Sequence, residues 1–322
     1  MALRREFRPW LPEKPTGLSV PGENEMKFRT FQEAARQTDQ RQGTDLADIA
    51  VHLLGMVGEA GSVATEYKKL LRDGPAHTAA KARIREELGD VLWYTSALAT
   101  KLGLDLDDIA RANLEKTRDR WLRTTADPLD DQYPLAEQLP RSGTFEFVAS
   151  VSDAGRPTVQ VRSDGRWMGN PLTDSSHVDD GYRFHDVFHL AYAAVLGWSP
   201  VTRKLMGRKR KSDPEVDEAE DGGRAIVTEE GIALMAFAYA TSHNYLDGVT
   251  RLDFPFLDVI KDVATPYEVG VRTAADWEQA ILTGFAAWRA LRDSDGGTVI
   301  LDSARRSLTV QGQGLGADSV LP

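Results

Sequence analysis

Three acidic residues in the first third of the chain have the types and the spacing to bind a metal ion. Glu87 and Asp90 stand three residues apart in a segment with helical periodicity, so their carboxylates share one face, about 4.5 Å apart along the axis. Glu59 lies in the preceding helical segment, beside the apolar stripe where a neighbouring helix would pack. Carboxylates gathered in this way repel one another, and a hard divalent cation relieves the repulsion. Taken alone, however, such a pair is most often a solvated helix face.

Glycines lie beside these acids and favour the metal interpretation. Gly58, Gly61 and Gly89 all fall inside segments with helical periodicity. Each costs about 1 kcal/mol relative to alanine in a helix interior, so each needs a reason. Close approach of two helices, or backbone room for a ligand, would supply one.

A second group with possible chemistry lies in the C-terminal half. His185 and His189 are four residues apart on an expected helix, the spacing at which two imidazoles can share a zinc ion. The order His-Asp-x-x-His is similar to a metalloprotease helix, but the shorter acid changes the geometry of the base, so proteolysis is not expected. Phe184 and Phe188 surround the pair with apolar groups. They favour hydrogen-bonded histidines lining a core over a ligand role, and both interpretations stay open.

A basic block is joined directly to an acidic block between Arg203 and Asp221. Such a pair of blocks is typical of a solvated loop that neutralises itself. The alternative is a mobile loop whose cations meet a polyanionic ligand, with two glutamates of the next helix joining the histidines in a second metal or nucleotide site. The second-site candidates are therefore His185, His189, Glu229, Glu230, Arg210 and Lys211.

The elements that must position the first group are helical. Apolar periodicity and helix-stop residues predict four helices, at about 26–43, 45–72, 78–102 and 105–121, with Asp105 capping the last. Four amphipathic helices on short connections predict a helical bundle. The apolar stripe of the second helix is Leu46, Ile49, Leu53, Val57, Ala60, Val63, Ala64, Tyr67 and Leu71.

Beyond about residue 141 the periodicity changes to two. Segments 145–148 and 158–161 predict one β-hairpin, and 298–301 with 307–310 a second. Helices are expected at about 179–197, 225–247 and 274–292. The fold class is thus mainly α, with an all-α bundle followed by an α+β domain. The expected divisions are an irregular arm at 1–25, the bundle at 26–124, a linker at 125–141 and the α+β domain at 142–322.

Composition limits the possible functions. A length of 322 residues suits two domains, and a net charge of −10 argues against general nucleic-acid binding. The absence of cysteine excludes disulfides and thiolate metal sites. The N-terminal residues contain no apolar core of a signal peptide, and no apolar run approaches the ~18 residues that span a bilayer. We therefore expect a cytoplasmic protein without a membrane partner.

Several phrases occur in the order found in one known family. They are GEAG at 58–61, EYKKLLRDG at 66–74, EELGDVLWY at 86–94 and LGLDLDDIARANLEKTRDRW at 102–121. With them, the segment from Phe28 to Trp121 resembles the MazG family of all-α nucleoside triphosphate pyrophosphohydrolases. The second half of the chain is similar to the C-terminal extension found on some MazG-like proteins.

The resemblance implies an activity and assigns residues to it. The expected reaction is Mg²⁺-dependent cleavage of an NTP or dNTP at the α–β bridge to the monophosphate and pyrophosphate, with Mn²⁺ as an alternative ion. The resemblance also implies dimers or tetramers. The implied metal ligands are Glu59, Glu87 and Asp90; the implied phosphate contacts are Asn113, Lys116 and Arg120, and Gln32 is a candidate for touching base or sugar.

One position departs from the family pattern. The family has a second glutamate three residues after the first, and this sequence has Ser62 there. Glu66 lies on the same face about 10 Å further along the axis, where it could assist a second metal but not replace the missing ligand. The chain is then either an enzyme with three metal carboxylates or a nucleotide-sensing, regulatory binding protein with a weakened site. A third alternative puts the main hydrolase site in the C-terminal domain, on the two histidines.

Overall fold

The computed structural model describes residues 26–125 and 127–311. The expected arm at 1–25 lies outside them. The chain divides into two compact units, with the boundary between Lys116 and Thr117, and each unit is described by itself below.

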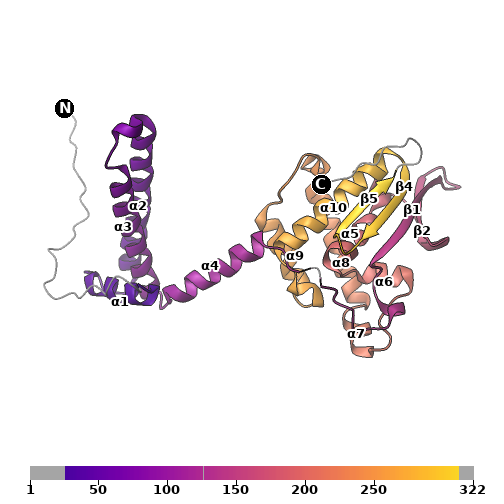
Figure 1. Cartoon of the computed structure of the whole chain (residues 1–322), viewed down its shortest axis with the longest axis horizontal. Coiled ribbons are helices and arrows are strands. Elements are labelled where there is room, and N and C mark those ends of the chain that lie inside the picture. The colour runs from indigo at the N-terminus through magenta and orange to yellow at the C-terminus, as the bar shows by residue number, and fades with distance from the viewer. Residues whose placement is uncertain (1–25, 126, 312–322) are drawn as a thin grey trace. The chain divides into compact units, whose positions relative to one another are not determined.

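Four helices form the N-terminal unit, as expected (Figure 1). They are α1 (Phe28–Thr38), α2 (Leu46–Asp73), α3 (Ala80–Lys101) and α4 (Leu106–Trp121), which continues past the unit boundary. Asp45 caps α2 by accepting a hydrogen bond from the Asp48 amide at 2.8 Å, and Gly74, with a φ of 55°, ends it. α2 and α3 pack along each other and α1 packs on α3, whereas Leu106 is the only buried residue of α4.

Polar contacts, and not only apolar ones, hold α1 and the loop after it against α3. The indole of Trp93 donates to Thr38 Oγ1 at 2.8 Å. Asp39 lies between His52 of α2, at 3.1 Å, and the ammonium of Lys101, at 2.9 Å. The pKa of Asp39 is held low although burial opposes its charge, because Lys101 and the Arg41 amide donate to it.

The polarity of α2 differs from the expectation. Its buried residues are His52, Glu59 and Glu66, which recur every seven residues and face α3. The expected apolar stripe points outward instead: Leu46 is 86% exposed, Val57 65% and Leu71 70%. Periodicity located an apolar face, but most of that face is exposed in the described chain.

α2 also corrects the expectation about apolar runs. Residues 46–76 form the one helix of the described chain that is long and apolar enough, by length and composition, to cross a membrane. Only 11% of an apolar 18-residue stretch of it is buried. A single helix of this kind is weak evidence, because helices of soluble proteins pass the same test.

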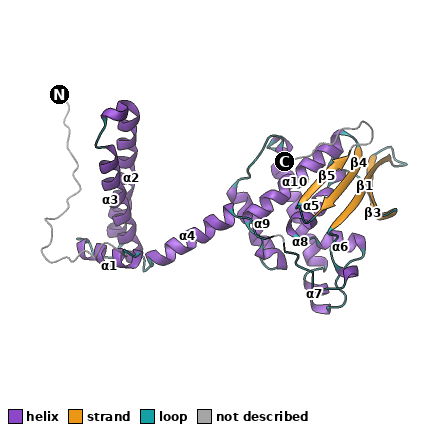
Figure 2. Ribbon diagram, in the orientation of Figure 1, coloured by secondary structure: helices purple, strands orange, loops and turns teal. Residues whose placement is uncertain are grey.

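The C-terminal unit is built on an antiparallel five-stranded sheet in the order β3-β2-β1-β4-β5 (Figure 2). Its strands are β1 (Ser142–Val151), β2 (Pro157–Ser163), β3 (Arg166–Leu172), β4 (Gly296–Asp302) and β5 (Ser307–Gln311). Both expected hairpins are confirmed, β1 with β2 and β4 with β5, and β3 was not predicted. β1 pairs with β4, so the two hairpins form a single sheet.

Six helices accompany the sheet. They are α5 (Asp186–Leu196), α6 (Pro200–Met206), α7 (Pro214–Ala219), α8 (Gly223–Thr241), α9 (Phe254–Ala264) and α10 (Ala274–Asp293). α5 and α10 pack on each other and against β4 and β5. The core of this unit contains the fully buried rings of Trp198, Trp277 and Trp288. The mainly α fold with an α+β C-terminal part is confirmed.

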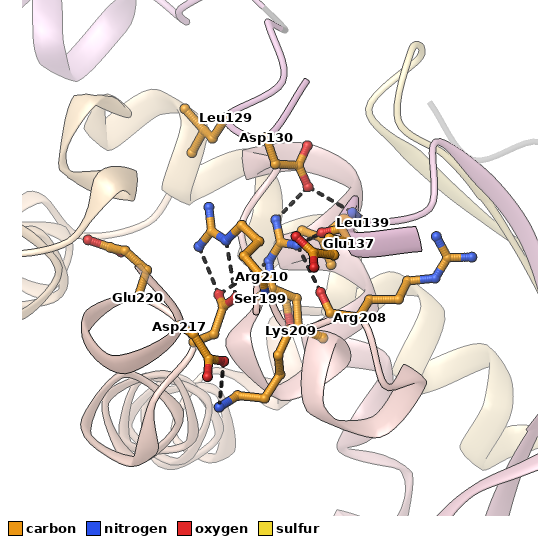
Figure 3. A network of polar contacts seen from close by, with 12 residues as sticks. Leu129, Asp130, Glu137, Leu139, Ser199, Arg208, Lys209, Arg210, Asp217 and Glu220 are labelled. Carbon is orange, nitrogen blue, oxygen red and sulfur yellow. Dashed lines mark hydrogen bonds and ion pairs between the residues drawn. The ribbon is translucent and has the colours of Figure 1, made fainter. Parts of the chain in front are cut away.

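The segment expected as a linker, 125–141, lies within the C-terminal unit. Asp130 is fully buried there and accepts the Leu139 amide at 2.7 Å (Figure 3). It also accepts hydrogen bonds from the guanidiniums of Arg141 and Arg203. Although burial opposes the charge, these donors hold the pKa of Asp130 below its usual value.

Candidate metal centre of the helical unit

The antiparallel packing of α2 and α3 brings Glu59 to Glu87 and Asp90. One carboxylate oxygen from each lies within 4.8 Å of the other two. Glu59 is 9% exposed and the other two are half-buried. The spacing of Glu87 and Asp90 on one helix face, expected from the sequence, therefore meets an acid from the opposite helix.

The electrostatics of this group are those of crowded acids. Burial, then the charge of Asp90 and the carboxyl of Glu87, raise the pKa of Glu59. Burial, then Glu87, raise the pKa of Asp90. Both raised pKa values mean that the carboxylates disfavour one another's negative charge. A cation among the three oxygens would instead favour their ionised forms.

Tyr94 and Gly55 complete the same region and were missed from the sequence. A Cβ on Gly55 would lie 2.4 Å from the ring of Tyr94, so this glycine is what lets the ring pack on α2. Burial, then the charges of Glu59 and Asp90, raise the pKa of Tyr94, whose hydroxyl stays neutral beside them. The available signal was helical spacing, because Tyr94 follows Asp90 by four residues and Gly55 precedes Glu59 by four.

Comparison with known proteins identifies the family of the chain. Residues 50–122 match the model of the MazG nucleotide pyrophosphohydrolase domain, and residues 124–314 match that of the MazG C-terminal domain. The chain belongs to the MazG family. Its N-terminal unit thus carries the domain of a nucleotide pyrophosphohydrolase, a hydrolase that acts on phosphoric anhydrides.

One curated relative of the MazG domain is the Gene 37 protein of Mycobacterium phage L5. It is 41% identical over 69 residues, which are 21% of this chain and 60% of the phage protein. The chain therefore spans less than two thirds of the length of that relative. No solved structure matches the chain.

Glu66 is held apart from the three acids of the MazG domain. Its carboxylate accepts Lys69 Nζ at 2.5 Å and His77 Nε2 at 3.2 Å. The hydrogen bond from Lys69 keeps the pKa of Glu66 low although burial opposes its charge. Glu66 is therefore already bound by the Lys69 ammonium and the His77 ring. Ser62 is half-buried one turn after Glu59, and no acid takes its place in the three-carboxylate group.

The expected substrate residues have different surroundings. The amide of Gln32 donates to Thr100 Oγ1 at 3.1 Å and to the Leu104 carbonyl at 2.9 Å, while its oxygen accepts the Leu106 amide at 2.9 Å. Gln32 therefore holds the start of α4, and its contact with base or sugar stays a prediction.

On α4 itself, Asn113 and Lys116 lie on exposed turns of the helix. Arg120 falls in the C-terminal unit, where its guanidinium stacks on the rings of Trp121 and Phe254 at 4.8 and 4.7 Å. Its cation is thus engaged by aromatic faces.

The glycines next to the acids are not explained by close packing within the chain. A Cβ at Gly58, Gly61 or Gly89 would meet nothing within 4 Å. The expectation that two helices approach closely there is wrong for the described chain, and the space beside these glycines is open. Room for a ligand, or for a second chain, is the remaining reason for them.

In the MazG C-terminal domain, the charged blocks are not a solvated loop. Arg210 is fully buried and binds Asp221 at 2.8 Å and Glu268 at 2.7 Å, and Lys209 binds Asp217 at 3.1 Å (Figure 3). The rival expectation of a mobile loop with Arg210 meeting a polyanion is also wrong, because its guanidinium is occupied by these carboxylates. Lys211 is exposed.

The remaining second-site candidates do come together. His185, His189, Glu229 and Glu230 form one cluster between α5 and α8. Although burial opposes the charge, Glu229 and Glu230 raise the pKa of His189 to about 10, whereas burial lowers the pKa of His185.

Proposed function

We propose that the MazG domain hydrolyses a nucleoside or deoxynucleoside triphosphate at the α–β bridge, with Mg²⁺ held by Glu59, Glu87 and Asp90. The observation that carries the proposal is the meeting of three carboxylates from two helices within 4.8 Å. An all-oxygen, anionic donor set fits a hard cation such as Mg²⁺ or Mn²⁺ and suits softer ions less well.

The residues of the chain then have distinct roles. Glu87 and Asp90, one turn apart, orient the ion, and Glu59 holds it from the opposite helix. When bound, the ion neutralises phosphate charge and promotes ionisation of the attacking water. Glu59 or Glu87 accepts the proton of that water. Lys116 and Asn113 contact the phosphates, so that Lys116 offsets the charge of the departing pyrophosphate.

Pyrophosphate release across a Mg²⁺ titration tests this function, with a panel of ribo- and deoxynucleotides separated by chromatography. Glu87→Gln and Asp90→Asn keep the side-chain shape but remove charge that the metal requires, so each should reduce turnover at least 100-fold. Glu86→Gln is the matched control, because Glu86 is exposed on the same helix and lies outside the three-carboxylate group. Wild-type turnover by both active-site variants would refute the assignment.

A sensor is the second candidate, and Ser62 is the observation that favours it. Here the resemblance expects an acid, and Glu66 does not replace it because Lys69 and His77 bind its carboxylate. A sensor would bind nucleotide and Mg²⁺ without releasing pyrophosphate. Equilibrium binding measured beside turnover separates the two functions.

We also propose that the MazG domain associates with further copies of this chain. Leu54 is 72% exposed and Leu46 and Val57 lie on the same outward side of α2, whereas the polar residues of the helix face α3. Exposed apolar residues along one helix are typical of an interface. Light scattering at micromolar concentration should find a dimer or tetramer, and Leu54→Glu should shift it toward monomer. A monomeric wild-type protein would contradict this.

A further inference from the structure

The cluster between α5 and α8 has a geometry that ordinary core histidines do not require. His185 lies directly before α5 and His189 one turn later, and Glu230 lies on α8. Glu230 Oε2 is 3.4 Å from His189 Nε2 and 3.9 Å from His185 Nε2. The three ligand atoms lie within 4.8 Å of one another.

Hydrogen bonds fix which nitrogen of each ring faces Glu230. His185 Nδ1 is 2.9 Å from the carbonyl oxygen of Tyr182, and His189 Nδ1 is 2.8 Å from Glu229 Oε1. A carbonyl and a carboxylate can only accept, so both Nδ1 atoms donate. An ion that displaces the Nε2 proton of His189 would then meet a lone pair on both Nε2 atoms, and an outer hydrogen bond of this kind is what orients metal-binding histidines.

Glu229 is built into the domain as a positioning residue. It is fully buried, and besides His189 it accepts Ser199 Oγ at 2.6 Å and the Val201 amide at 2.8 Å. Three donors bind this carboxylate, so it keeps the His189 ring in one orientation. The Tyr182 ring stacks on His185 with a centroid distance of 4.4 Å and restrains that ring too.

The atom that points to a ligand is His189 Nε2. His189 is 1% exposed, and among the described residues its Nε2 makes no hydrogen bond of good geometry, although Glu230 Oε2 lies 3.4 Å away. Leaving a buried polar atom unpaired costs about 1–3 kcal/mol, so such an atom needs an explanation. It is directed toward the cluster, where a ligand would satisfy it.

We propose that the MazG C-terminal domain binds one divalent transition-metal ion through His185 Nε2, His189 Nε2 and the Glu230 carboxylate. Ligands on a tetrahedral Zn²⁺ ion lie about 3.3 Å apart, so the distances of 3.4 and 3.9 Å need only small rotations to close. Two nitrogens and one oxygen favour Zn²⁺ over Mg²⁺, in contrast to the all-carboxylate group of the MazG domain. The site is independent of the proposed pyrophosphohydrolase reaction.

The exposure of the ligands shows how the ion enters. The Glu230 side chain is 41% exposed, whereas those of His185 and His189 are 12% and 1%. The ion therefore reaches the site from the Glu230 side, and the fourth position opens to solvent. Three protein ligands with one open position are typical of zinc sites that bind a substrate or water, and structural sites are closed by four.

Isothermal titration of the full-length, chelator-treated chain with Zn²⁺ tests the proposal. Millimolar Mg²⁺ is present throughout, and Glu87→Gln serves as the background, so that the carboxylate group of the MazG domain does not compete for Zn²⁺. We expect one Zn²⁺ per chain, weakened at least 100-fold by His185→Gln or Glu230→Gln. Glu229→Gln should weaken it about 10- to 100-fold, as loss of an outer partner does. His177→Gln is the control, because His177 is exposed and outside the cluster.

A spectroscopic measurement reports the ligand atoms directly and so adds to the affinity measurement. Co²⁺ in the same site should give visible d–d absorption with nitrogen ligation, and His185→Gln should remove it while circular dichroism shows an intact fold. No Zn²⁺ binding by the folded chain would overturn the proposal. So would affinity that the His185 and Glu230 variants leave unchanged, because the ion would then bind elsewhere.

Discussion

Replacing Glu59 with glutamine should stabilise the metal-free protein and remove its response to magnesium. Glu59 faces Glu87 and Asp90 across the helix pair, and burial and these two acids raise its pKa. The neutral amide keeps the shape of the side chain and removes one member of the repelling group. The same change removes a metal ligand, so the effects on stability and on activity have opposite signs.

The magnitude follows from the distances. Two unit charges 4.8 Å apart repel by about 3 kcal/mol at an effective dielectric constant of about 20. Glu87 and Asp90 are half-exposed, so water screens part of this, and we expect the free energy of unfolding without metal to rise by about 1 kcal/mol. For a domain of this size that is about 4–8 °C in Tm. At 100 times its Kd, Mg²⁺ should add about 2.7 kcal/mol to the wild type and nearly nothing to the variant.

Thermal unfolding with and without Mg²⁺, alongside pyrophosphate release, measures both effects. Glu86→Gln removes the same charge from the exposed side of α3 and should leave the Mg²⁺-dependent rise in Tm in place. A Glu59→Gln protein that is less stable without metal, yet still stabilised by Mg²⁺, would refute the reasoning. The carboxylates would then not be the magnesium site.

Three further outcomes are expected. Ser62→Glu should tighten Mg²⁺ binding in a titration, and turnover that appears only in this variant would identify the parent as a sensor. Gly55→Ala should lower the free energy of unfolding by about 1–3 kcal/mol, because its Cβ would lie 2.4 Å from an aromatic ring. Gly58→Ala has open space around its Cβ and should raise the free energy of unfolding by up to about 1 kcal/mol. Urea denaturation measures both changes. Asp130→Asn should cost about 3–5 kcal/mol because it removes one of the two buried carboxylates that lie beside the buried Arg203. The pKa of Asp130 is lowered in the folded protein. Its contribution to the free energy of unfolding is therefore present above about pH 4 and is lost as the pH falls further. Acid unfolding of the wild type and of the variant measures this loss.

The sequence predicted those features that depend on local signals. The limits of α2 follow from the Asp45 cap and the Gly74 stop, and both hairpins follow from alternating segments around turn residues. The shared face of Glu87 and Asp90 is equally local, because helical spacing alone sets it. β3 was missed because Gly169 and Pro171 interrupt its alternation.

What could not be predicted depends on distant partners. The sequence of the basic block is typical of a solvated loop. In the structure Asp130 binds Arg203 and Glu268 binds Arg210, and the residues of each pair are more than 50 positions apart. The direction of the α2 stripe is a similar case. Periodicity identifies an apolar face, but it does not say whether the same chain or another covers it.

With the proposed association, the inverted polarity of α2 would link the activity of this protein to its abundance. Glu59 is buried beside Glu87 and Asp90 of α3, while Leu54 and Val57 are exposed on α2, where the proposed association would cover them. If association orders the helix pair, each chain becomes competent only when paired, and activity per chain falls on dilution. Total activity then rises more steeply than the amount of protein, up to saturation of the assembly. A cell would set a threshold for nucleotide hydrolysis by expression level alone, without an effector molecule.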